Sequence, residues 1–380
     1  MVWLITTVSS RTRILGPLVL GIAAIALAIP ALQRCSAISR KEAPAYRRAH
    51  GSVVQIVFTD RRTLSRNELS ELFASDDNGL SWRALPGTPH AMSIANGTEL
   101  WGAQGWPGHH ERASASVSYS SDSGETWSTV ELKLPDARGD ELYARLPAAF
   151  INEPGAAPLL VMSDFHLARP ELAADSTKWK TVGRRALGEE RVRGTVDRAA
   201  GLQHGHSIYI AASGSIYFSA DDGESWSRQE VHPFFDAQIR CRERTCYALL
   251  SQRGSEWNGL MTTEVGTNDW KSVRTFDAAE LAPILTAVQK HGPVSLFGAT
   301  TLLVTAKGVF VAGIVNAGPD PWGIVLSVAP DGSLATIGHA LPKGLRVLEQ
   351  ASDGSLWTGG EGAYRLQDGE WSPIWVAPPP

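Results

Sequence analysis

Short runs in which apolar and polar residues alternate, divided by turn-forming residues, fill the chain from about residue 50 to residue 375. The segment SIYIAASGSIYFSADDGESWSRQEV (207–231) contains three such runs and two tight turns. The stretch 91–132 contains four runs, AMSIANG, ELWGAQ, ASVSYSS and TWSTVEL. A period of two with β-branched and aromatic residues predicts β-strands. We therefore expect four-stranded antiparallel meanders.

One segment departs from this alternation. DAAELAPILTAVQK (277–290) has helical spacing of its apolar residues, and Asp277 with Glu280 forms a capping-box pattern at its start. Pro283 interrupts the pattern, because proline cannot donate the backbone hydrogen bond that a helix interior needs. The segment predicts a short helical insertion between sheets.

Three octapeptides share the pattern Ser-x-Asp-x-Gly-x-Ser/Thr-Trp: SDDNGLSW (75–82), SSDSGETW (120–127) and SADDGESW (219–226). We call them the octapeptide turns and expect each between the third and fourth strands of a sheet. The Asp can accept backbone N–H groups, the Gly adopts positive φ without steric cost, and the Trp buries a large ring. Their predicted role is structural, for Ser75, Asp77, Gly79, Trp82, Ser120, Asp122, Gly124, Trp127, Ser219, Asp221, Gly223 and Trp226.

The octapeptide turns recur with a long period. Trp82 and Trp127 are 45 residues apart, and weaker copies of the pattern end at Trp179 and Trp270. Sequence periods of 40–50 residues built from short strands are typical of β-propellers. The predicted fold is an all-β, seven-bladed β-propeller with four-stranded antiparallel blades and an N-terminal signal or anchor helix. The expected divisions are 1–35 signal peptide or membrane anchor, 36–49 linker, 50–376 propeller and 377–380 tail.

The N-terminal segment is apolar and follows positive charge. Ile14 to Leu32 is a run of 19 uncharged residues preceded by Arg11 and Arg13. This pattern is typical of an export signal, and residues 26–28 (Ala-Leu-Ala) offer a cleavage site. An uncleaved inner-membrane anchor is the alternative, since the run is long enough to span a bilayer, and a buried core helix is a third. In the first two cases the body of the chain is extracytoplasmic: periplasmic, secreted or membrane-anchored.

Two cysteines are close in sequence. Cys241 and Cys246 flank the residues RERT, between two strand-like runs. A hairpin would bring them together, so an oxidising compartment favours a disulfide. Two reduced core cysteines remain the alternative.

Composition and net charge limit the classes of partner that the chain is expected to bind. The chain has 380 residues, of which 43% are hydrophobic, enough for a core. Its formal net charge is −4. Without a basic excess there is no electrostatic reason to expect nucleic acid as a partner.

The octapeptide turns resemble the Asp-box, or bacterial neuraminidase repeat. This repeat occurs in sialidases, in sortilin-type receptor propellers and in the propellers of photosystem II assembly factors. The resemblance implies a propeller with these turns at its periphery, away from the ligand face. It does not imply sialidase activity, because the repeat occurs in enzymes and binding proteins alike.

The residues of a sialidase site are not found in the expected places. Sialidases use a tyrosine nucleophile with an acidic partner, and the resemblance implies an Arg-Ile-Pro motif before the first repeat. The most similar tripeptide is Arg145-Leu146-Pro147, which follows the second octapeptide turn. Tyr209, Tyr217 and Tyr247 lie in strand patterns, where packing roles are commoner. We therefore predict no catalytic residue, with a sialidase-like glycoside hydrolase as the alternative function.

Histidine pairs suggest no metal site or cofactor. His109-His110 are adjacent, and His204 and His206 have strand spacing. Zinc would need a third and a fourth ligand at matched distance, and the sequence identifies none. Solvated loop histidines are the simpler interpretation.

Strand parity predicts a partner-binding face. In a four-stranded meander the turns between third and fourth strands lie on one rim, and the connections between second and third strands lie on the opposite rim. We assign 59–68, 104–112, 163–170, 251–259 and 316–323 to the latter. Tryptophan and arginine are enriched in interface hot spots, so we predict a non-catalytic binding or assembly module for a protein or glycan. The alternative is that the rings only fix their own loops. The candidate residues are Arg61, Arg62, Trp106, His109, His110, Arg112, Arg169, Arg253, Trp257 and Trp322.

Overall fold

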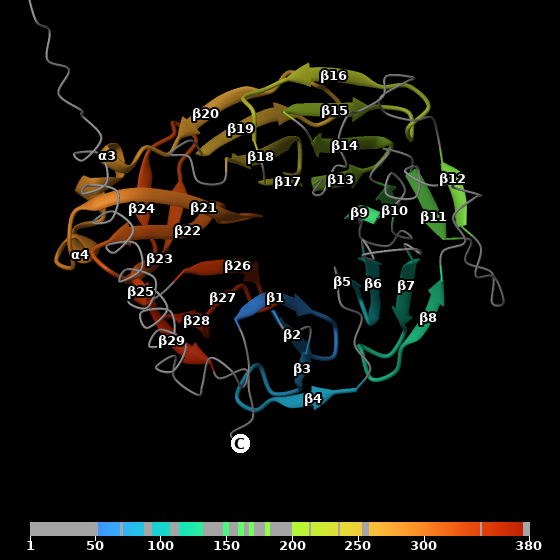
Figure 1. Ribbon diagram of the computed structural model, residues 1–380, viewed down its shortest axis with the longest axis horizontal. Coiled ribbons are helices and arrows are strands. Elements are labelled where there is room, and N and C mark those ends of the chain that lie inside the picture. Colours follow the sequence, from blue (N-terminus) through green and yellow to red (C-terminus); the bar gives the residue numbers. More distant parts are fainter. Residues whose placement is uncertain are drawn as a thin grey trace, which may run out of the picture. The chain divides into compact units, whose positions relative to one another are not determined.

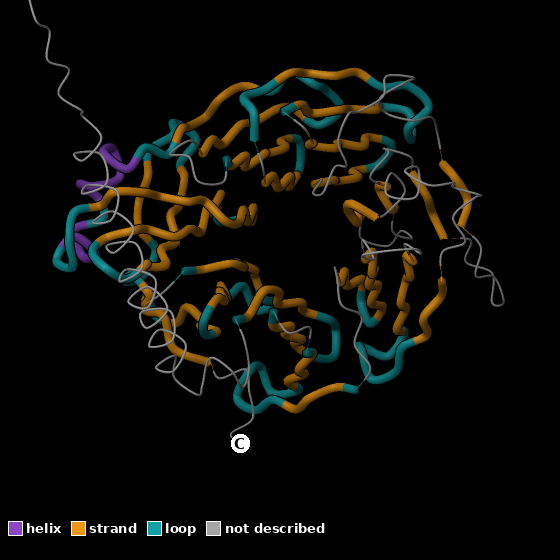
Figure 2. Tube along the Cα trace, in the orientation of Figure 1, coloured by secondary structure: helices purple, strands orange, loops and turns teal. Residues whose placement is uncertain are grey.

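The computed structural model describes the chain from residue 52 to residue 374 with internal gaps, and helices are few in this region (Figure 2). Among these residues, no helix is long and apolar enough to cross a membrane. The expected signal or anchor segment and linker lie outside the described residues. The described ranges are 52–68, 71–86, 93–106, 114–131, 147–151, 159–162, 167–170, 179–182, 200–212, 214–234, 236–252, 258–342 and 344–374.

The strands form antiparallel sheets in which sequence neighbours are hydrogen-bonded neighbours (Figure 1). The first half of the described chain contains three sheets. They comprise β1 Val53–Phe58, β2 Thr63–Asn67, β3 Leu72–Ser75 and β4 Arg83–Leu85; β5 Ser93–Asn96, β6 Glu99–Trp106, β7 Ser114–Ser120 and β8 Ser128–Glu131; and β9 Pro147–Ile151, β10 Leu159–Met162, β11 Leu167–Pro170 and β12 Trp179–Val182.

The remaining strands continue the same meander order. They comprise β13 Ala200–His204, β14 Ser207–Ala212, β15 Ser215–Ser219 and β16 Ser227–Glu230; β17 Asp236–Arg242, β18 Thr245–Ser251, β19 Asn258–Glu264 and β20 Lys271–Thr275; β21 Val294–Thr305, β22 Gly308–Ala317, β23 Pro321–Val328, β24 Leu334–Thr336 and β25 Leu341–Pro342; and β26 Leu345–Gln350, β27 Leu356–Gly360, β28 Ala363–Gln367 and β29 Glu370–Ile374.

Consecutive sheets are in contact around a closed ring (Figure 1). The first strand of each sheet lies innermost and touches the inner strands of the next sheet. Along the chain the contacts run β1 to β5, β6 to β9, β9 to β13, β13 to β17, β17 to β21 and β21 to β26, and β26 then contacts β1. Residues 52–374 therefore form an all-β propeller with antiparallel blades.

The all-β propeller with antiparallel blades agrees with the prediction, whereas the predicted architecture in full needs correction. The expectation was seven blades of four strands each, with a helix in front of them. Instead the blades are not uniform, because β25 pairs with β23 and makes the β21–β24 sheet five-stranded. The register of this extra pairing joins Gly323 and Leu341, beyond the point where β24 ends. No N-terminal helix is found among the residues that the structure describes.

The core lies between adjacent sheets as separate apolar clusters. One joins Tyr209 and Ile216 of the β13–β16 sheet to Ile239 and Ala248 of the β17–β20 sheet. Between the last and first sheets, Val53 and Ile56 pack with Trp357. Burial on both faces of a strand replaces strict alternation by continuous apolar runs, as in β14, where all six residues are buried.

The helical insertion follows β20. It consists of α3 Ala278–Leu281, η3 Ala282–Ile284 and α4 Thr286–Gln289. The Asp277 side chain accepts the N–H of Ala279, so it caps the first helix. Pro283 lies in the 3-10 turn, which explains why the helices are short.

Candidate functional site

The three octapeptide turns have the same hydrogen bonds. They join β3 to β4, β7 to β8 and β15 to β16. In the second, the Ser120 hydroxyl donates to Asp122 at 2.8 Å and accepts the Gly124 N–H at 2.8 Å, and the Trp127 indole N–H donates to the Gly124 carbonyl at 3.1 Å. The first and third repeat these bonds. Each turn is therefore stabilised by hydrogen bonds among its own residues, and its Asp side chain accepts some of these bonds.

The octapeptide aspartates are strongly acidic. Hydrogen bonds from the side chain and backbone of Ser81 and from Ser75 lower the pKa of Asp77 to about 2. The equivalent bonds from Ser225 and Ser219 lower the pKa of Asp221 to about 2. These groups are charged acceptors of hydrogen bonds at neutral pH, not proton donors.

The octapeptide turns pack against the preceding sheet. A Cβ atom on Gly79 would lie 2.6 Å from Trp357 of the last sheet, and one on Gly124 would lie 3.3 Å from Leu85 of the first sheet. Trp82 packs with the cluster that contains Trp357. The turns therefore contribute to the contacts between blades.

Arg61 and Arg62 lie on the rim of the octapeptide turns, contrary to the assignment from strand parity. The stretch 63–67 forms β2, so the two arginines occupy the turn between the first and second strands. Arg62 Nε pairs with Asp76 at 2.8 Å, and its Nη1 contacts Glu125 of the next octapeptide turn. Arg62 therefore links two blades, while Arg61 is exposed.

Arg169 and Trp322 also contact other residues of the fold. Arg169 lies within β11 and donates from Nη2 to Gln203 at 2.8 Å. The Trp322 ring stacks on His291, which follows α4, with centroids 4.1 Å apart and planes at 23°. The Trp322 ring thus contacts the segment between α4 and β21, which leads into its own sheet.

One of the remaining candidate residues, Trp106, belongs to a described strand. Trp106 ends β6, where its backbone pairs with Ser114. The others lie outside the described residues. They are His109, His110, Arg112, Arg253 and Trp257.

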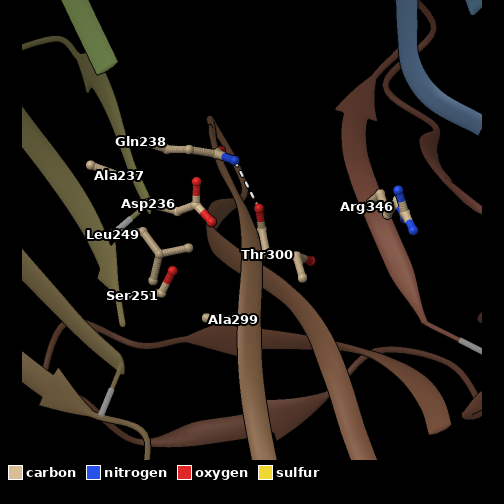
Figure 3. Close-up of a pocket in the computed structure, with 8 residues that line it drawn as sticks. All are labelled: Asp236, Ala237, Gln238, Leu249, Ser251, Ala299, Thr300 and Arg346. Atoms are coloured by element: carbon tan, nitrogen blue, oxygen red, sulfur yellow. Dashed lines mark hydrogen bonds between the residues drawn. The ribbon is translucent and has the colours of Figure 1, made fainter. Parts of the chain in front are cut away.

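A pocket of about 310 Å³ opens among the inner strands β17, β21 and β26. It lies at the start of β17 and β26 and at the end of β18, which is the rim opposite the octapeptide turns. Asp236 and Ser251 form one wall, Arg346 lies on the opposite wall, and Thr300 lies between them (Figure 3). The other lining residues are Ala237, Gln238, Leu249 and Ala299.

The floor of the pocket is fixed by side chains that bridge the sheets. Gln238 donates to the Thr300 carbonyl at 2.9 Å (Figure 3). Its Oε1 accepts the Leu302 N–H at 2.9 Å. The Thr300 hydroxyl donates to the Leu345 carbonyl at 2.8 Å. Three successive sheets are thus joined beneath the pocket, so its walls are held in place before any ligand binds.

Two ionisable residues of β26, Arg346 and Glu349, differ in their surroundings. Arg346 is 52% exposed, and its Nη1 lies 3.8 Å from a Glu68 carboxylate oxygen, too far for a hydrogen bond. Farther along the same strand, burial raises the pKa of Glu349, while nearby Arg240 acts in the opposite direction. Neither Asp236 nor Arg346 was among the predicted binding residues, although both stand at the starts of inner strands, where strand parity places them on the predicted face.

The tyrosines considered for sialidase chemistry pack within the fold. Tyr209 is fully buried, its hydroxyl accepts the Gly266 N–H at 2.8 Å, and burial raises its pKa. Tyr217 is 3% exposed, and Tyr247 packs against the largest apolar cluster. Tyr209 and Tyr217 are therefore core residues, and Tyr247 packs against the core.

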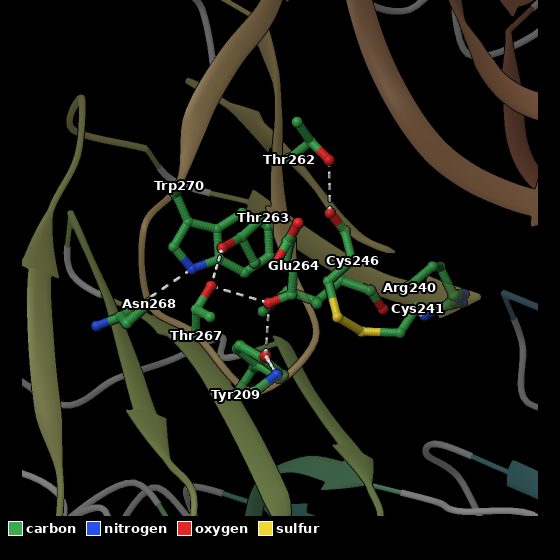
Figure 4. Close-up of a disulfide and its surroundings, with 12 residues drawn as sticks. Tyr209, Arg240, Cys241, Cys246, Thr262, Thr263, Glu264, Thr267, Asn268 and Trp270 are labelled. Atoms are coloured by element: carbon green, nitrogen blue, oxygen red, sulfur yellow. Dashed lines mark hydrogen bonds between the residues drawn. A yellow bond between two sulfur atoms is a disulfide. The ribbon is translucent and has the colours of Figure 1, made fainter. Parts of the chain in front are cut away.

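The described residues contain no group of three or more His, Cys, Asp or Glu that could hold a metal ion. His206 instead contacts Asp222 at 2.6 Å. Cys241 and Cys246 form a disulfide across the β17–β18 hairpin (Figure 4). Their pairing is in register, so the bridge ties two adjacent strands.

No family model matches this chain, and no curated protein matches it in sequence. Its fold, however, is similar to solved structures. YCF48 from Cyanidioschyzon merolae has a TM-score of 0.55 at 12% identity, over 83% of this chain and 95% of that one. YCF48 bound to D1 peptide has a TM-score of 0.53 at 12% identity, over 86% and 94%.

An enzyme shares the architecture as well. The GH74 xyloglucanase from Xanthomonas campestris has a TM-score of 0.52 at 17% identity, over 83% of this chain and 52% of that one. At such identities the likeness concerns the fold alone. The chain is therefore similar in fold both to a protein solved with a bound peptide and to a xyloglucanase.

Proposed function

We propose that this chain is a non-catalytic β-propeller that binds a protein partner on the rim opposite the octapeptide turns. The observation that carries the proposal is the pocket on this rim, with Asp236 and Arg346 on opposite walls. A preformed concave site with a few polar groups is the usual form of a binding site. The Gln238 bridge to the next sheet holds it rigid.

A protein partner suits this pocket better than a glycan. None of the eight described lining residues has an aromatic ring on which a sugar could stack. The fold shared with YCF48, which has been solved with a peptide bound, is consistent with this choice. The matching hydrogen bonds of the three octapeptide turns support their assignment as Asp-boxes with a structural role.

The proposed location is extracytoplasmic. It rests on the apolar run from Ile14 to Leu32 after two arginines, and on the Cys241–Cys246 disulfide, a bond that persists in oxidising compartments. Whether the run is a cleaved signal or an inner-membrane anchor can be read from the N-terminal residue of the protein purified from its own cells.

Affinity capture tests the proposed function. The purified chain is immobilised and exposed to an envelope extract of the cells that produce it, beside a variant with both Asp236→Lys and Arg346→Glu. We expect a protein that the original chain retains and the variant loses. Equal retention by both chains would contradict the proposal. Hydrolysis of a sialoside or of xyloglucan by the purified chain would contradict its non-catalytic character.

A further inference from the structure

The pocket at the inner strands presents two opposite charges across a small space. Asp236 is the first residue of β17 and Arg346 the second residue of β26, and Figure 3 shows them on facing walls. At about 310 Å³ the pocket lies at the lower end of the range for ligand sites. It has room for a short segment and not for a folded domain.

We propose that the pocket binds a short polypeptide segment carrying one basic and one acidic side chain, the basic one at Asp236 and the acidic one at Arg346. This inference rests on the proposed function and specifies its ligand. A guanidinium can hold a carboxylate through two parallel hydrogen bonds, and a carboxylate accepts strong charge-assisted bonds from an ammonium. A segment with two like charges would be repelled at one wall.

The polar groups between the two charges suit a peptide backbone. Thr300 lies between the two walls, and Ser251 lies on the wall of Asp236, near apolar Leu249 and Ala299. Arg346 is exposed and only 3.8 Å from Glu68, so a ligand carboxylate can approach the guanidinium at the expense of a weak contact. Binding would then connect the β17–β20, β21–β24 and β26–β29 sheets.

A thermodynamic cycle with synthetic peptides tests the inference. The probes are end-blocked peptides with one Lys and one Glu separated by zero to three Gly, with matched versions in which Lys or Glu is Gln. Calorimetry on the full chain should show that either replacement weakens binding by about tenfold, the loss expected for one charge-assisted contact. In the Asp236→Asn variant the Lys replacement should have no further effect, whereas the Glu replacement should still cost about tenfold.

In the Arg346→Gln variant the Glu replacement should have no further effect, whereas the Lys replacement should still weaken binding. The reason is that this variant removes the protein's partner for the peptide Glu. The control is the double variant Asp269→Asn with Lys271→Gln, which removes an exposed pair on the opposite rim, with Nζ–Oδ2 3.0 Å. It should bind all peptides as the original chain does. Equal affinity for all the probes, or the same loss in every variant, would overturn the inference. Capture of an envelope protein that depends on the pocket, without peptide binding, would overturn this ligand assignment and leave the proposed function intact.

Discussion

Phe58, at the end of β1, packs edge-on against Trp357 of β27, with ring centroids 5.3 Å apart and planes at 81°. The contact joins the first sheet to the last and therefore closes the ring. Every strand of the first sheet comes from residues 53–85 and every strand of the last from residues 345–374. No strand is shared between the two, so the closure depends on side-chain packing.

Truncation of Trp357 should therefore weaken the ring at this seam. The ring is 1% exposed and packs with Val53 and Ile56 of the first strand. We expect Trp357→Ala to lower the free energy of unfolding by about 3–5 kcal/mol, the usual cost of emptying a large aromatic site. Chemical denaturation measures it. Phe58→Leu keeps an apolar side chain at position 58 and should therefore lower the free energy of unfolding by less. A loss below about 1 kcal/mol for Trp357→Ala would contradict the view that this contact stabilises the closure of the ring.

Gly79 offers a test of how an octapeptide turn packs. Its φ is +88°, and an added Cβ would meet Trp357 at 2.6 Å. Gly205 has φ +59° and no heavy atom within 4 Å of such a Cβ. It is therefore a matched control for the cost of placing alanine at positive φ without a steric clash. We expect Gly205→Ala to cost about 1–2 kcal/mol and Gly79→Ala to cost clearly more. Equal shifts in denaturation midpoint would show that the turn does not press against the last sheet.

Acid should destabilise the octapeptide turns within a defined pH window. Hydrogen bonds from Ser81 and Ser225 lower the pKa values of Asp77 and Asp221 to about 2, below their ordinary value of 3.8. For Asp122, burial acts to raise the pKa, but the bonds from Thr126 and Ser120 outweigh it and again give about 2. A lowered pKa means that the stabilisation is present above pH 4 and is lost as the pH falls toward 2.

The measurement for this window is the urea midpoint of the original chain and of Asp221→Asn between pH 7 and pH 2. Asn cannot change its charge, so the variant should be less stable at pH 7 and should lose less stability on acidification. The two curves should converge toward pH 2. Parallel curves would mean that Asp221 contributes nothing through its charge.

We expect Trp322 to stabilise the segment between the helical insertion and β21, and not to bind the partner. Its ring stacks on His291 and packs beside the helical insertion. Trp322→Ala should therefore lower the thermal midpoint, since it removes a partly buried aromatic ring, while capture of the partner by the folded variant stays unchanged. Lost capture with an unchanged midpoint would restore Trp322 as a binding residue.

The repeats in the sequence were enough to predict the propeller and the position of the octapeptide turns. Asp, Gly and Trp at fixed spacing specify a corner by local hydrogen bonds, and local patterns are what a sequence displays directly. The helical insertion was recognised for the same reason, because Asp277 caps it and Pro283 breaks it within a few residues.

The parts that depend on pairing between distant segments could not be predicted. The extra strand β25 arises because Leu341 pairs with Gly323, and nothing in either local pattern requires that pairing. Arg62 was assigned to the wrong rim because 63–67 reads as polar, TLSRN, although it forms a largely buried strand. The pocket combines residues from three sheets, so its charges are neighbours only in the folded ring.

Hydrogen–deuterium exchange of the chain with and without the captured partner tests the central claim most directly, because it reports which rim the partner covers. The account predicts slower exchange at the start of β17, at the end of β18 and at the start of β26, with no change in the octapeptide turns 75–82, 120–127 and 219–226. Protection of the octapeptide turns, with unchanged exchange around Asp236 and Arg346, would contradict it.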